Sequence, residues 1–218
     1  MIFMAVTLGF FAENIRELIT EHKAAGVLAQ SLFEDLKKDT SSLHNLIEFS
    51  DKKIAASETL ISILHSPHNQ WNDTSFYRNN LPLLTSLPFT PTDGTYAQMK
   101  TAGTLRYFKQ SLVNLMNAYD VQLKKLAYRD NVVDKGTWMI APYDLDILNI
   151  EVMSDMRFNR PIAHEMYIKL SDKNMIDKFV NEVKMIQIFS TRSLQEYHQQ
   201  LNMADELMKA LKMAYEFE

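Results

Sequence analysis

The chain has 218 residues, no cysteine and a formal net charge of -4 at pH 7. The absence of cysteine excludes disulfides, iron–sulfur clusters, thiolate zinc sites and a cysteine nucleophile. The acidic balance contains no basic cluster, so it gives no electrostatic support for nucleic-acid binding. Only five glycines and six prolines occur, which favours long helices over a turn-rich sheet protein.

The first twelve residues, MIFMAVTLGFFA, carry no charge. A helix needs about 20 apolar residues to span a bilayer, so this stretch alone is too short. It also lacks the basic leader and cleavage site of a signal peptide. Two interpretations remain open: a hydrophobic helix start buried in the protein, or residues 1–12 as the end of a transmembrane helix whose beginning is missing. The abrupt change from aromatic to charged residues favours the second and places Phe3, Leu8, Phe10 and Phe11 in lipid or at its edge.

The longest helical pattern runs from Glu13 to Leu64 and contains no proline. Its apolar residues recur every three or four positions and form three neighbouring lines along a helix. Members of this stripe include Ile15, Leu18, Ile19, Leu32, Leu36, Leu46 and Leu60. Such a stripe is typical of a helix buried along one side. A helix of this length, about 75–80 Å, requires a partner of matching length.

Four of the six prolines lie between His65 and Gly94, so Ser66-Pro67 predicts the end of the long helix. We expect a loop here with one short helical turn near Ser75–Asn79. The many leucines of the segment favour an ordered cap over a flexible tether.

Two further helices are expected before the sequence becomes ambiguous. The first covers Thr95–Gly103, and its final glycine can take the left-handed conformation that ends a helix. The second covers Leu105 to about Asp130 and is broken by Asp134-Lys135-Gly136. From Thr137 to Arg160 the pattern half-alternates, which leaves room for a short strand.

The partner for the long helix is predicted at Asn174–Tyr215, with Ser171 or Asp172 as its cap. At about 60 Å it nearly matches the first helix. We therefore expect an all-α protein in which two long, coiled-coil-like helices run antiparallel. The middle helices would pack alongside, and the irregular Pro67–Gly94 segment would cap the far end, so that residues 13–218 form one helical bundle domain.

The histidines do not form a recognisable metal site. Pro67 lies between His65 and His68, so the two do not share a helix face. His164-Glu165 lacks the second histidine that a zinc-protease helix places four positions on. The sequence therefore predicts neither a metal nor another cofactor.

A nucleophilic or phosphate-binding site is equally unsupported. No Gly-x-Ser-x-Gly motif occurs, and Gly94 and Gly103 are too far apart for a phosphate loop. Ser57 and Ser190 lie in the middle of predicted helices, where a solvated or back-bonded hydroxyl is the default. The prediction is that the chain is not an enzyme and has no catalytic residues.

The proline-rich segment carries the best candidates for contact with a partner or a ligand. They are Trp71, Phe76, Tyr77, Phe89 and Tyr96, followed by Arg106 and Tyr107. Burial in the core is the competing interpretation, and we favour it because aromatic side chains supply core area first. The polarity of the bundle interior near Tyr96 and Tyr119 would distinguish a ligand-binding protein from one with a protein-interaction role. A pocket where Arg106 and tyrosine hydroxyls converge would indicate a ligand, and a closed apolar core would indicate a protein-interaction role.

Three motifs occur in order: LGFFAENIRE at Leu8–Glu17, SLFEDLKKD at Ser31–Asp39 and TYAQMKTAGTLRYF at Thr95–Phe108. Together they resemble a bacterial family of single-pass, membrane-anchored helical proteins of unknown function, over about residues 6–130. The resemblance implies an N-terminal anchor in the inner membrane and a helical domain that faces the periplasm. It implies no enzyme activity and no catalytic residues. The chain departs from the family at the basic leader and the first half of the membrane helix.

Two functions from different classes follow from these expectations. The first is a structural or interaction role at a membrane, with another protein or a second copy of the chain as partner. The alternative is a ligand-sensing bundle that acts through a partner chain. An enzyme comes third, because no set of base, nucleophile or metal ligands can be assembled from the spacings.

Overall fold

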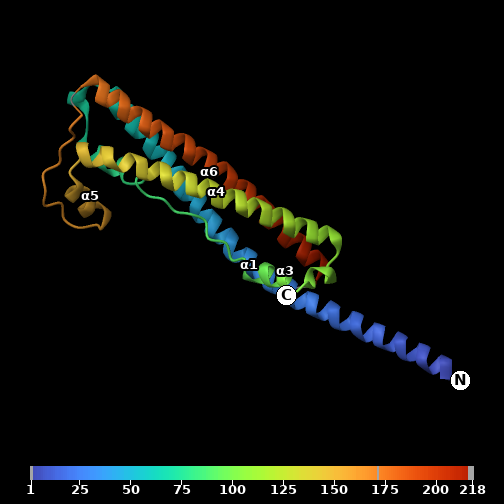
Figure 1. Cartoon of the computed structure of the whole chain (residues 1–218). Helices are drawn as coiled ribbons and strands as arrows, with labels where there is room; N and C mark the ends of the chain where they lie inside the picture. Colours follow the sequence, from blue (N-terminus) through green and yellow to red (C-terminus); the bar gives the residue numbers. More distant parts are fainter. Residues whose placement is uncertain (1, 171, 216–218) are drawn as a thin grey trace. The chain divides into compact units, whose positions relative to one another are not determined.

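A computed structural model of the chain describes residues 2–170 and 172–215. This part of the chain is all-α, as predicted, with two short 3-10 turns and no β-strand. The helices are α1 (Ile2–His65), α2 (Asp73–Asn80), α3 (Gly94–Thr101), α4 (Gln110–Ile147), α5 (Ile150–Arg157) and α6 (Lys173–Ala214) (Figure 1). The strand considered between Thr137 and Arg160 does not form. Among the described residues, β-type pairing is limited to one isolated antiparallel bridge between Leu148 and Ile168.

The chain divides into two compact units. The first unit comprises Met1–Ser42, Thr90–Leu123 and Gln200–Glu218, and the second comprises Leu43–Phe89 and Lys124–Gln199. Helices α1, α4 and α6 each contribute one part to each unit. Both units are therefore built from the same three long helices.

Within each unit α1 and α6 run antiparallel, which confirms the predicted bundle (Figure 1). In the second unit Ser50 lies near Ser193, while Gln187 donates a hydrogen bond to Glu58 at 3.3 Å. Residue numbers in α6 thus fall as those in α1 rise. In the first unit the rings of His22 and Tyr215 stack with their centroids 6.0 Å apart.

Helix α4 runs antiparallel to α6, and so parallel to α1, in each unit. Two contacts with α6 in the second unit show this direction. Tyr197 donates to Asp130, and further along α4 the Lys178 ammonium lies 4.3 Å from the Tyr143 ring centroid. Because α1 ends in the second unit and α4 begins in the first, the connecting residues must pass from one unit to the other. The proline-rich segment is therefore more than a cap: α2 packs on the second unit, and the following residues lead in extended form to α3.

Helix α4 differs most from the sequence prediction. It begins after a 3-10 turn at Thr104–Tyr107, and it continues past the expected break at Asp134-Lys135-Gly136 and through Pro142. Gly136 serves close helix packing: a Cβ atom there would lie 2.9 Å from Cε2 of Phe189. The prediction for Gly103 is confirmed, because its φ of 68° is the left-handed conformation that follows α3.

Each unit has its own hydrophobic core. In the first unit the buried stripe of α1 packs with residues of α3, α4 and α6, and in the second unit with α2, α5 and the rest of α4 and α6. Leu32, Leu36, Leu46 and Leu60 are buried, as their spacing predicts. Ile15, Leu18 and Ile19 belong to the same stripe but are exposed, because no other described segment covers this part of α1.

Candidate functional site

Most of the aromatic residues considered for partner contact are core residues. Phe76 and Tyr77 are 0% exposed, and Phe89 and Tyr96 are also buried. The Tyr77 hydroxyl accepts a hydrogen bond from the Asn149 backbone at 2.7 Å and donates one to the Tyr167 carbonyl at 2.8 Å. These four side chains therefore hold the fold together and offer no exposed surface to a partner.

Trp71 is half-buried, and its indole nitrogen donates to the Ser66 carbonyl at 3.1 Å. The Trp71 ring also stacks on that of Phe76, with centroids 6.1 Å apart. It closes the end of α1 against α2, which is a structural role.

Arg106 and the neighbouring tyrosines do not converge on a pocket. The Arg106 guanidinium is exposed, lies 5.1 Å from the Tyr107 ring centroid and approaches Glu21 at 3.7 Å. The hydroxyl of Tyr96 is bonded to Asn117 at 2.7 Å instead. A cavity of about 10 Å³ beside Tyr96 leaves room for no more than a water molecule.

A buried carboxylate ties the connecting segment to the first unit. Asp39 accepts hydrogen bonds of 2.7 Å from the Tyr119 hydroxyl and from the Thr92 backbone N–H. Burial raises the pKa of Asp39, and it also raises the pKa of the Tyr119 hydroxyl. The pair supplies an acceptor for a backbone N–H of an extended segment, which would otherwise be left unsatisfied.

The second unit repeats this arrangement. Asp130 accepts hydrogen bonds of 2.7 Å from the Tyr197 hydroxyl and from the Phe89 backbone N–H. Burial raises the pKa of the Asp130 carboxyl as well. Two Asp–Tyr pairs thus bind backbone N–H groups only three residues apart in the extended segment, and their arrangement is structural.

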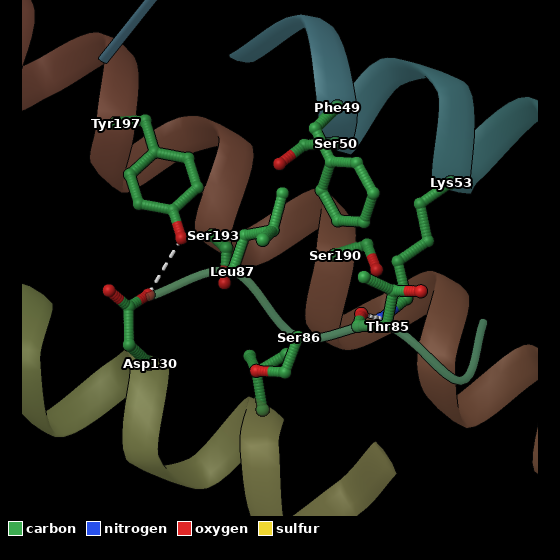
Figure 2. Close-up of a pocket in the computed structure, with 11 residues that line it drawn as sticks. Phe49, Ser50, Lys53, Thr85, Ser86, Leu87, Asp130, Ser190, Ser193 and Tyr197 are labelled. Carbon is green, nitrogen blue, oxygen red and sulfur yellow. Dashed lines mark hydrogen bonds between the residues drawn. The ribbon is translucent and has the colours of Figure 1, made fainter. Parts of the chain in front are cut away.

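A small polar cavity in the second unit is the strongest candidate site (Figure 2). It has a volume of about 20 Å³ and is lined by residues of α1, α4, α6 and the connecting segment. Lys53 lines it and is only 3% exposed, and its ammonium donates to the Thr85 carbonyl at 2.8 Å. Burial lowers the pKa of Lys53 to about 8. The hydroxyl groups of Ser190 and Ser193 are also buried at this cavity.

Sequence reasoning missed Lys53, although a signal was present. Lys53 lies seven residues after Leu46 and seven before Leu60, on a line of the buried stripe. A lysine on such a line predicts a buried ammonium group, which is uncommon unless the charge is paired or hydrogen-bonded.

Asp144 in α4 is a further buried acid of the second unit, 1% exposed. Its Oδ1 accepts a hydrogen bond from Nδ2 of Asn80 at 2.7 Å. Among the described residues Oδ2 of Asp144 and Oδ1 of Asn80 have no hydrogen-bond partner. Burial raises the pKa of Asp144 to about 7.

The beginning of α1 is an apolar surface with no cover from the described chain. Met4, Val6, Leu8, Phe10 and Phe11 are 55–70% exposed. Of the residues expected at a membrane, Leu8, Phe10 and Phe11 are therefore accessible, while the side chain of Phe3 lies outside the described part of the structure.

Two searches over the described residues were negative. No helix within residues 2–170 and 172–215 combines the length and the apolar content needed to cross a bilayer. In the same part of the chain no three histidine, cysteine or acidic side chains are grouped as metal ligands would be.

Comparison of the chain with protein-family models, curated proteins and solved structures finds no match.

Proposed function

We propose that the protein is attached to a membrane by the start of α1 and has a structural or interaction role there. The observation that carries the proposal is the uncharged, exposed stretch up to Ala12, which ends abruptly at Glu13. In line with the family resemblance, the membrane is the bacterial inner membrane and the bundle faces the periplasm.

The distribution of apolar side chains around α1 favours lipid over a single protein partner. At about 100° per residue, Met4, Leu8 and Phe11 lie on one side of the helix. Val6 and Phe10 lie on the opposite side. A neighbouring helix buries only one face, whereas acyl chains surround a helix on all sides, so this pattern fits a lipid environment better.

The part of α1 that follows supports a protein partner. Ile15, Leu18 and Ile19 are exposed, yet they continue the stripe that is buried further along at Leu32 and Leu36. An apolar face of this kind fits a helix of another protein or of a second copy. Ligand sensing is less well supported, because Arg106 reaches only the adjacent Tyr107 hydroxyl at the surface and does not converge with Tyr96 and Tyr119 on a pocket.

Membrane attachment can be tested with the Phe10→Glu/Phe11→Glu double variant. We expect the unaltered protein to stay with membranes after an alkaline wash and to co-sediment with lipid vesicles. Two carboxylates in the lipid-facing stretch should reduce vesicle binding at least about tenfold, because charged residues partition poorly into a bilayer.

The matched control is Val27→Glu, which alters an exposed apolar residue of the same helix beyond the proposed lipid contact. This variant should bind vesicles as the unaltered protein does. Release of the unaltered protein by the alkaline wash, or equal losses in both variants, would contradict the membrane proposal. Protease added from the periplasmic side should digest the bundle, and protection would contradict the proposed orientation.

The interaction role is tested by photo-crosslinking from position 18 in membranes. We expect a specific crosslink to another protein or to a second copy, and its loss in the Ile15→Glu/Ile19→Glu variant. Absence of any protein crosslink, together with a small molecule that raises the melting temperature, would favour ligand sensing instead.

A further inference from the structure

Ser190 and Ser193 of α6 differ from the other buried serines in their hydrogen bonding. In α1, Ser50 donates to the Leu46 carbonyl at 2.8 Å, and Ser57 donates to the Lys53 carbonyl at 2.9 Å. These are the back-bonds expected of a serine inside a helix. Ser190 and Ser193 are each 3% exposed, but their hydroxyl groups have no hydrogen-bond partner among the described residues. Both hydroxyl protons therefore remain available to a group in the cavity.

The buried ammonium of Lys53 also has unused donor capacity. Its hydrogen bond to the Thr85 carbonyl uses one of three N–H groups. Among the described residues no carboxylate lies within ion-pair distance of Lys53. Asp130 is the acid that lines the cavity, and it is bonded to Tyr197 and to the Phe89 backbone. The positive charge of Lys53 is thus buried without a counter-ion, which is unfavourable.

We propose that this cavity binds a small monovalent anion such as chloride, held by the Lys53 ammonium and the Ser190 hydroxyl group. Both groups can donate a hydrogen bond, and an anion is a pure acceptor. A volume of about 20 Å³ accommodates a monatomic ion or one water molecule, and it excludes phosphate and organic carboxylates.

The arrangement of the cavity separates the anion from the acidic group. In Figure 2, Lys53 and Ser190 lie together with Thr85 at one end, and Ser193 lies with Asp130 and Tyr197 at the other. An anion at the Lys53 end neutralises the buried ammonium and satisfies the Ser190 hydroxyl. It therefore connects α1, α6 and the extended segment at one point of the second unit.

The titratable groups around the cavity set the pH dependence. They are Lys53 from α1, Asp130 from α4 and Tyr197 from α6, and the extended segment contributes Thr85, Ser86 and Leu87, which do not titrate. Burial lowers the pKa of Lys53 to about 8, so the empty site loses its charge above that pH. Anion binding should therefore weaken as the pH rises from about 8 to 10.

The proposal is tested by thermal unfolding of the full chain in sodium chloride and in sodium gluconate at equal ionic strength and pH 7. We expect chloride, but not gluconate, to raise Tm in a saturating manner by about 2–6 °C. Bromide should act in the same way. Broadening of the chloride-35 NMR signal, reversed by excess bromide, provides a direct measure of binding.

Two variants and one control assign the effect to this cavity. Lys53→Met should abolish the chloride-dependent rise in Tm, and Ser190→Ala should weaken chloride binding at least about tenfold. Lys52→Met is the matched control, because its exposed ammonium pairs with Glu48 at 2.6 Å on the surface, and it should keep the full effect.

A cavity that holds only water predicts a different result. Equal Tm values in chloride and gluconate for the unaltered protein would overturn the proposal, as would the same rise in Lys53→Met. If Lys53→Met does not fold, the serine variant decides, because undiminished chloride-35 broadening in it would also overturn the assignment.

Discussion

Replacing Leu36 with aspartate should lower the free energy of unfolding by about 4 kcal/mol or more. Leu36 is 1% exposed and lies in the core of the first unit, near Leu32, Met116 and Leu207. The variant loses the apolar contacts of leucine and places a carboxylate among residues that offer it no cationic partner. Chemical denaturation followed by circular dichroism would measure the loss.

Two substitutions separate the effect of burial from that of side-chain shape. Leu36→Met keeps the volume and should cost less than about 1.5 kcal/mol. Leu18→Asp introduces the same charge at an exposed position of the same helix and should change the stability by less than about 0.5 kcal/mol. Unchanged melting of Leu36→Asp would show that α1 is not packed as described.

The Asp144→Asn variant should be more stable than the unaltered protein at pH 8, by up to about 4 kcal/mol, and equally stable at about pH 3. Burial raises the folded-state pKa of Asp144 from 3.8 to about 7. Below about pH 3 the carboxyl group is protonated in both states, so its contribution to stability is fully present. Between pH 4 and 7 the unfolded chain releases the proton while the folded protein retains it, and stability is lost. Asparagine does not titrate and avoids this loss.

The contact with Asn80 explains why asparagine should fit the site. Protonation gives Asp144 a hydrogen-bond donor, and it leaves Oδ1 free to accept from Nδ2 of Asn80. An amide at position 144 offers the same donor and acceptor. Unfolding measured between about pH 3 and 8 tests the prediction, with Asp146→Asn at an exposed position of the same helix as control. A pH profile for Asp144→Asn that parallels the unaltered protein would show that Asp144 is ionised in the fold.

The long helices could be predicted because their signals are local and repeated. The spacing of Leu32, Leu36, Leu46 and Leu60 predicts one buried face of α1, and each of these residues is buried. The same spacing carries no information about where the partner stops, so the exposure of Ile15 could not be predicted. The observed bundle confirms the fold class, and the membrane attachment stays a prediction.

The candidate site could not be predicted from the sequence because its residues are far apart in the chain. Lys53, Thr85 and Ser190 are brought together by α1, the extended segment and α6. The sequence predicts an ordinary helical serine at position 190, and only the missing back-bond in the structure distinguishes Ser190 from Ser57. The predicted helix break at Gly136 is wrong for a related reason. A glycine that allows Phe189 to approach cannot be distinguished, from the local sequence, from a glycine that ends a helix.

The pairing of α1 with α6 also fixes when each unit can be completed during synthesis. About 110 residues separate the end of α1 at His65 from the start of α6 at Lys173. At about 5–20 residues per second, a ribosome needs roughly 5–20 s to make them. During that interval the apolar stripe of α1 has no α6 to cover it, and both cores still lack one of their three long helices. Neither unit is an independent early product of translation, because each core is completed only when its part of α6 has been made.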